Sequence, residues 1–214
     1  MEKISEIIAK QLLQIKAIKL QPANPFTWAS GWKSPIYCDN RKALSFVEVR
    51  NYIKGEFARI VREKYPEAEV IAGVATGAIA QGALVADLLN KPFVYVRSAP
   101  KGHGLENLIE GDYRPGQKVL VIEDLISTGG SSLKAVEALR SAGCDVVGML
   151  AVFSYGFPVA ADAFEEAGVE LTTLSNYQDL IGVAVAGGYI TSRDISTLQE
   201  WRKDPSAWGN TAGV

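Results

Sequence analysis

Residues 119–131 read Val119-Leu120-Val121-Ile122-Glu123-Asp124-Leu125-Ile126-Ser127-Thr128-Gly129-Gly130-Ser131, and they change from apolar to acidic to small and hydroxyl-bearing. The four leading apolar residues are typical of a buried parallel strand. Ligands bind at the carboxyl edge of open α/β sheets, so we expect Glu123 and Asp124 to emerge there, where the strand ends. Ser127 to Ser131 directly precede a helical pattern, which would point backbone N–H groups at an anion. The segment therefore predicts a ligand site on an α/β fold.

The acidic residues and the anion cradle together predict a ligand that carries both hydroxyls and phosphate. Carboxylates repel phosphate, but they accept hydrogen bonds from sugar hydroxyls or hold a metal that bridges to the phosphate. A ribose phosphate meets both demands. The plainer alternative is a strand followed by a Gly-rich turn with exposed acidic residues, because short motifs also occur by chance.

This segment resembles the phosphoribosyl pyrophosphate (PRPP) motif of the type I phosphoribosyltransferases. In that family the acidic pair faces the ribose hydroxyls and the following loop holds the 5-phosphate. The resemblance implies that Asp124 is catalytic and that Ser127 lies nearest the base. It also implies that PRPP contacts Glu123, Asp124, Leu125, Ile126, Ser127, Thr128, Gly129, Gly130 and Ser131.

Outside this segment the chain alternates between helical and strand patterns. Apolar residues recur at helical spacing from Ile4 to Ile18, and a second helix is predicted to begin at Ser45, which has capping-box spacing with Glu48, and to end near Tyr65. Predicted strands over 70–75, 93–97, 119–122, 146–153 and 170–174 then alternate with predicted helices over 79–89, 132–142, 159–167, 176–186 and 192–203. This order indicates an α/β fold with a mostly parallel central sheet flanked by helices.

The resemblance implies the type I phosphoribosyltransferase fold with an N-terminal hood segment. We expect a single domain over residues 1–214. Within it, residues 1–44 would form the N-terminal helix and hood, residues 45–205 the α/β core, and residues 206–214 a frayed tail.

The predicted hood, residues 26–41, mixes aromatic, hydroxyl and cationic side chains without helical periodicity. Such a mixture could stack a planar heterocycle and hold its negative charge through Lys33, or its aromatic side chains could complete the core. Composition alone favours the second interpretation. The order Phe-Thr, Ser-Gly, Lys-Ser-Pro and an aromatic residue is similar to the N-terminal segment of family members that act on orotate. That resemblance implies that Lys33, Tyr37 and Ser127 bind orotate.

Residues 98–114 form a connection that is long for a compact α/β unit, which predicts a mobile lid. Lys101 and His103 lie there among glycines, although a lone histidine is more often incidental than catalytic. The resemblance implies that both are catalytic, contact PRPP and act across the interface of a homodimer. It also assigns to PRPP binding Arg97, which ends one predicted strand, and Thr76, which follows another.

Four positions depart from the pattern of some or many family members. Ala29 and Ser98 stand where some members have basic residues, and Tyr155 stands where some have an arginine that contacts orotate. Those contacts are not carried over to this chain. Glu123 stands where many members have aspartate, which keeps the charge but lengthens the reach.

Composition and charge exclude several other classes of protein. A formal net charge of −2 without a basic run gives no electrostatic case for a nucleic-acid partner. Charged residues within Met1 to Lys10 are incompatible with a secretory signal, so we expect a cytoplasmic protein, and the apolar stretches are too short or too interrupted for membrane insertion. Cys38 and Cys144 lack the spacing of a zinc cluster or a disulfide framework.

The resemblance implies an enzyme that transfers ribose 5-phosphate from PRPP to N1 of orotate. The products would be orotidine 5-monophosphate and pyrophosphate, in de novo pyrimidine (UMP) biosynthesis. Mg2+ would enter on the pyrophosphate group, without a resident metal site. Two alternatives stay open: a purine phosphoribosyltransferase with a different hood, and a non-catalytic PRPP-sensing regulator.

Overall fold

The computed structural model describes residues 2–28, 31–99 and 108–208 of the chain. The chain divides into two compact units. Residues 1–43 and 175–214 make up the first unit, and residues 44–174 make up the second. The expectation that residues 1–214 behave as a single domain stays a prediction.

The second unit is built on a sheet with the strand order β10-β9-β8-β5-β6-β7 in the described residues. Its strands are β5 (Val70–Val74), β6 (Phe93–Val96), β7 (Ile109–Glu110), β8 (Lys118–Ile126), β9 (Asp145–Ser154) and β10 (Leu171–Asn176). Strands β6, β5, β8 and β9 pair in parallel, while β7 pairs antiparallel with β6. This arrangement confirms the predicted mostly parallel sheet.

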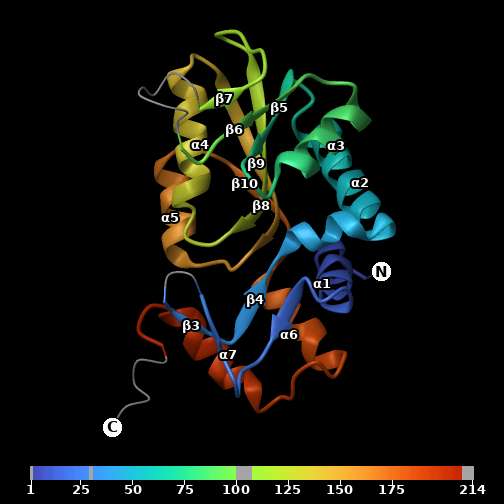
Figure 1. Cartoon of the computed structure of the whole chain (residues 1–214), viewed down its shortest axis with the longest axis vertical. Helices are drawn as coiled ribbons and strands as arrows, with labels where there is room; N and C mark the ends of the chain where they lie inside the picture. The colour runs from blue at the N-terminus through green and yellow to red at the C-terminus, as the bar shows by residue number, and fades with distance from the viewer. Residues whose placement is uncertain (1, 29–30, 100–107, 209–214) are drawn as a thin grey trace. The chain divides into compact units, whose positions relative to one another are not determined.

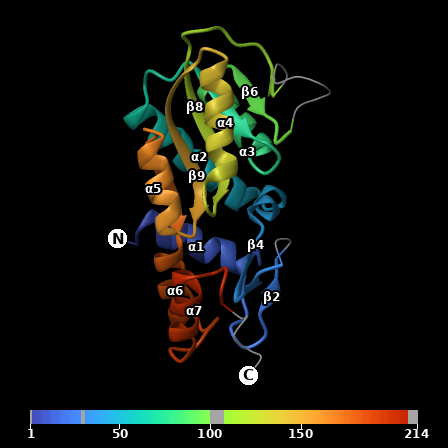
Figure 2. The same cartoon turned by 90° about the vertical axis from the view of Figure 1, so that its left-hand side faces the viewer.

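Helices cover both faces of this sheet, with α4 and α5 on one side and α2 and α3 on the other (Figures 1 and 2). Their bounds are α2 (Val47–Lys64), α3 (Ile79–Leu89), α4 (Gly130–Ser141) and α5 (Pro158–Glu166). A core of fully buried apolar side chains, such as Val121, Met149 and Leu139, lies between α4 and the sheet. Strand residues that are apolar on both faces suit this covered position, as the sequence pattern predicts.

Strand β8 is longer than the sequence predicts, and this corrects the expectation that Glu123 and Asp124 follow the end of a strand. Pairing with β5 stops at Ile122, but pairing with the long strand β9 continues to Ile126, which lies opposite Ser154. The acidic residues therefore lie inside β8, on the part of the strand that extends beyond β5.

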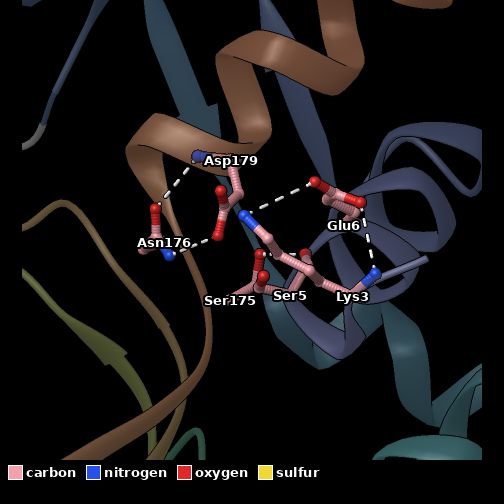
Figure 3. Close-up of polar contacts among 6 residues, drawn as sticks. All are labelled: Lys3, Ser5, Glu6, Ser175, Asn176 and Asp179. Carbon is pink, nitrogen blue, oxygen red and sulfur yellow. Dashed lines mark hydrogen bonds and ion pairs between the residues drawn. The ribbon is translucent and has the colours of Figure 1, made fainter. Parts of the chain in front are cut away.

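The first unit contains α1 (Ile4–Gln14), α6 (Tyr177–Ala186) and α7 (Asp194–Lys203), with the short strands β1 (Ile18–Leu20), β2 (Phe26–Thr27), β3 (Lys33–Ser34) and β4 (Ile36–Cys38). Figure 3 draws polar contacts at the start of α1 and of α6. The Ser175 hydroxyl donates to the Ser5 carbonyl at 2.8 Å, and the Asn176 side chain accepts from the Asp179 backbone N–H at 3.0 Å, which caps α6. A hydrogen bond with Ser5 holds the pKa of Asp179 below its ordinary value.

Three local predictions from the sequence are wrong. Ile18 is not helical, because the chain reverses at Lys16 (φ 55°) and Ile18 pairs with Cys38 in the β1–β4 ladder. Ser45 does not cap α2, because it ends the 3₁₀ helix η1 (Asn40–Ser45), and Phe46 takes the capping position without a side-chain hydrogen bond. The connection over 98–114 is not a loop throughout, because it contains β7, which pairs antiparallel with β6 at the edge of the sheet; that this connection acts as a lid stays a prediction.

Within the described residues, no helix has both the length and the apolar character needed to span a bilayer.

Candidate functional site

A cavity of about 310 Å³ lies where β5 ends and β8 continues. Its walls come from the loop after β5, from the far end of β8 and from the start of α4, all within the second unit. The lining residues are Val74, Ala75, Thr76, Gly77, Glu123, Asp124, Leu125, Ser127, Thr128, Gly129 and Ser131. The structure thus brings together most of the residues that the sequence assigns to PRPP.

The loop between β8 and α4 has the conformation of an anion cradle. Gly129 adopts φ 84°, a left-handed conformation that favours glycine, and α4 begins at the next residue. The N–H groups in the first turn of a helix lack intrahelical acceptors, and the helix dipole places partial positive charge there. The exposed side chains of Thr128 and Ser131 flank this turn with hydroxyl groups. The loop can therefore hold a phosphate without a cationic side chain.

Glu123 is turned into the protein at the base of the cavity. Its side chain is only 5% exposed, and its Oε1 accepts a hydrogen bond from the Asp124 backbone N–H at 2.8 Å. Its Oε2 accepts from the hydroxyl of Ser132, also at 2.8 Å. Burial raises the pKa of the Glu123 carboxyl from 4.5 to about 8, and the negative charge of Asp124 adds to the rise.

Asp124 is half-buried and lies against the loop that follows β5. A Cβ atom added to Gly77 would lie 2.1 Å from Oδ2 of Asp124, well inside contact distance. With any larger residue at position 77, the Asp124 carboxylate would have to leave its present position. The peptide bond between Ala75 and Thr76, in the same loop, is cis. The loop therefore sets the position of the Asp124 carboxylate at the cavity wall.

A second, larger cavity of about 1070 Å³ shares Val74, Ala75 and Ser131 with the first. Arg97 and Gly130, both predicted to bind PRPP, line this second cavity rather than the first. Nη1 of Arg97 lies 3.4 Å from Oε1 of Glu110 in β7, and the Arg97 backbone N–H donates to the Leu108 carbonyl at 2.7 Å.

Two side chains near the motif face the interior of the protein. Ile126 is fully buried and lines neither of these cavities, while its carbonyl accepts from the Tyr155 N–H at 3.1 Å. Tyr155 is 2% exposed, stacks on Phe157 at 5.5 Å between ring centroids and meets Phe153 edge-on at 5.7 Å. The position at which some family members carry an arginine is therefore part of an aromatic core.

The predicted orotate contacts Lys33 and Tyr37 belong to the first unit. Lys33 Nζ donates to Thr27 Oγ1 at 2.8 Å across the β2–β3 hairpin, and Tyr37 is 39% exposed. Trp28, in contrast, meets the buried Trp201 edge-on at 5.6 Å. Part of the aromatic content of the hood thus completes the core of this unit, as composition suggested.

Other predicted site residues lie outside the described part of the chain. They are Lys101 and His103; Ala29, one of the positions that depart from the family pattern, also lies outside that part. Within the described residues no three acidic, cysteine or histidine side chains are grouped as they would be around a metal ion.

Sequence reasoning missed two residues that shape the site. Ser132 lies one position beyond the motif, and a buried serine in the first turn of a helix carries no local signal of its partner Glu123. Gly77 sits in a Gly-rich loop that suggests backbone donors, but its close approach to Asp124 depends on tertiary packing.

Comparisons with known proteins give one family. Residues 48–156 match the phosphoribosyl transferase domain. An orotate phosphoribosyltransferase of Bacteroides fragilis is 65% identical over 208 residues, which cover 97% of this chain and 98% of that protein. The crystal structure of orotate phosphoribosyltransferase from Aeropyrum pernix has a TM-score of 0.74 and 29% identity, covering 86% of this chain and 99% of that one. The Mycobacterium tuberculosis orotate phosphoribosyltransferase in complex with PRPP has a TM-score of 0.65 and 26% identity, covering 83% of this chain and 98% of that one.

Proposed function

This chain belongs to the phosphoribosyl transferase family, and on that premise we propose how it works as an orotate phosphoribosyltransferase. It transfers ribose 5-phosphate from PRPP to N1 of orotate, giving orotidine 5-monophosphate and pyrophosphate in de novo pyrimidine (UMP) biosynthesis. The observation that carries this function is the near-complete match to an orotate enzyme at 65% identity. The cavity at the end of β8 supports the same conclusion, because it offers an anion cradle next to a carboxylate.

The 5-phosphate of PRPP binds the loop of Ser127 to Ser131 and the first turn of α4. The loop conformation at Gly129 supports this position, as do the hydroxyls of Thr128 and Ser131. The ribose then lies over Asp124, whose carboxylate accepts hydrogen bonds from the ring hydroxyls. Leu125, which also lines the cavity, borders the ribose.

Cleavage of the bond between the anomeric carbon and pyrophosphate places positive charge on the ribose and negative charge on the leaving group. A carboxylate fixed close to the ribose stabilises the first charge, and Asp124 has this role. Backbone N–H groups near Thr76 and the guanidinium of Arg97 hold pyrophosphate, because both border the cavities from the side of β5 and β6. Lys101 and His103 of a second subunit complete this charge stabilisation.

Mg2+ is the expected cofactor. The donors around the cavity are hydroxyls, backbone amides and the Glu123–Asp124 pair, with Glu123 already engaged by Ser132. This set suits an ion held mainly by the oxygens of pyrophosphate. When bound, the ion would neutralise charge on the leaving group.

Orotate binds through Ser127, Lys33 and Tyr37. The ammonium of Lys33 is exposed and held by one neutral hydroxyl, so it can exchange that partner for the orotate carboxylate. The Tyr37 ring, which meets Phe26 at 5.7 Å, offers an exposed aromatic face to a planar base.

We further propose that the protein is a homodimer and that it is located in the cytoplasm.

The test is a substrate panel with purified protein, PRPP and Mg2+. Loss of orotate absorbance that requires PRPP, with pyrophosphate release, is the expected result, and uracil, adenine and hypoxanthine should stay unchanged. Turnover of a purine alone would mean that the segment 26–41 has been misinterpreted. Tight PRPP binding without turnover of any base would favour a sensor.

A further inference from the structure

A buried hydrogen bond joins β8 to the first turn of α4 beneath the cavity. The hydroxyl of Ser132 and Oε2 of Glu123 lie 2.8 Å apart, and the two side chains are 1% and 5% exposed. The residues between them in sequence, 124–131, include those that line the cavity from this side. The bond therefore closes the base of the loop that holds the anion.

Both oxygens of the Glu123 carboxyl already have a hydrogen-bond partner within the protein in this arrangement. Its Oε1 is taken by the Asp124 N–H and its Oε2 by Ser132. Asp124, in contrast, lies against Gly77 at the opposite wall and lines the cavity. The two neighbouring acidic residues thus have different environments, one facing inward and one facing the cavity.

We propose that Ser132 is a positioning residue for PRPP: by holding Glu123, it fixes the first turn of α4 and the loop that binds the 5-phosphate. The physical reason is that anion binding at a helix N-terminus depends on several N–H groups aimed at one point. The favourable electrostatic effect of the helix dipole is confined to the first turn, so the position of this turn decides the affinity. The hydrogen bond between Ser132 and Glu123 is a contact that restrains this turn against β8. The proposal rests on the proposed function, but it requires only that the cavity binds PRPP.

The experiment measures PRPP affinity by calorimetry in the presence of Mg2+, together with kcat and both KM values. Ser132→Ala should raise the Kd and the KM for PRPP about tenfold, while kcat and the KM for orotate stay within about twofold, since leaving a buried carboxyl without its hydrogen-bond partner has about this effect. Ser196→Ala is the control, because Ser196 is an exposed serine in the first turn of another helix, α7, where its hydroxyl donates to the Arg193 carbonyl, and it lines neither cavity. It should behave like the unaltered protein.

A second pair of variants keeps the proposal testable if Ser132→Ala fails to fold. Ser132→Thr and Ser132→Val have nearly the same shape, but only threonine keeps the hydroxyl. The Ser132→Thr protein should bind PRPP about tenfold more tightly than the Ser132→Val protein. Equal PRPP affinity of these two variants would overturn the proposal, as would a loss in Ser132→Ala that falls equally on kcat and on the KM for orotate. If the unaltered protein binds PRPP but turns over no orotate, the proposed function fails, and the calorimetry still tests Ser132.

Discussion

Replacing the buried Glu123 with glutamine should change how stability depends on pH. The carboxyl has a pKa of about 8 in the folded protein, against 4.5 as its ordinary value. Between these values the folded protein binds a proton that the unfolded chain has released, so the free energy of unfolding falls as the pH rises. At about 1.4 kcal/mol per pH unit, the loss between pH 5 and pH 8 is roughly 3 to 4 kcal/mol.

Glu123→Gln removes this titration but keeps the contacts. Its amide oxygen can accept from the Asp124 N–H, and its NH2 group can donate to Ser132. Urea unfolding of both proteins should be followed by far-ultraviolet circular dichroism, because all four tryptophans lie outside the second unit. Between pH 5 and pH 8, the free energy of unfolding of the unaltered protein should fall by about 3 to 4 kcal/mol more than that of the variant. Parallel curves for the two proteins would refute a raised pKa at Glu123.

Three further experiments test other parts of the site. Gly77→Ala forces a Cβ to within 2.1 Å of Asp124, so kcat should fall at least about 100-fold with little change in the unfolding midpoint. Gly55→Ala, a helical glycine with open space around it, is the control, and an equal loss in both variants would refute the steric argument. Lys33→Ala should raise the KM for orotate about tenfold or more and leave the KM for PRPP unchanged, whereas unchanged orotate affinity in steady-state kinetics would remove Lys33 from the site. When the inactive Lys101→Ala and Asp124→Asn proteins are mixed and exchange subunits, part of the activity should return, because a mixed dimer has one site with both residues intact. A mixture that stays inactive would argue against a lid that acts across a dimer.

The sequence identifies the fold and the position of the glycine-containing loop before α4, because both depend on local patterns. Strand β8, the glycine at 129 and the start of α4 are each specified by adjacent residues, so the anion cradle can be predicted before any contact is known. The limits of β8 cannot be predicted in the same way. Glu123 and Asp124 are polar and mark the end of the apolar run, but pairing with β9 keeps them in the strand.

The parts of the site that sequence could not predict depend on contacts between distant segments. Gly77 and Asp124 approach each other because the loop after β5 packs against the extension of β8. Ser132 is buried against Glu123 for the same kind of reason. Likewise Ile18 continues a helical spacing, yet its partner Cys38 in the β1–β4 ladder decides its conformation. Helical periodicity does not reveal such a partner.

We propose that the cavity at the end of β8 carries out phosphoribosyl transfer to orotate with Asp124 beside the ribose. The most direct test compares Asp124→Asn with the unaltered protein, measuring orotate consumption, pyrophosphate release and PRPP binding in the same preparation. The unaltered protein should consume orotate and release pyrophosphate in equal amounts. In the variant, turnover should fall at least about 100-fold while PRPP still binds and the unfolding midpoint is kept. Near-normal turnover by Asp124→Asn would show that the Asp124 carboxylate does not stabilise the transition state.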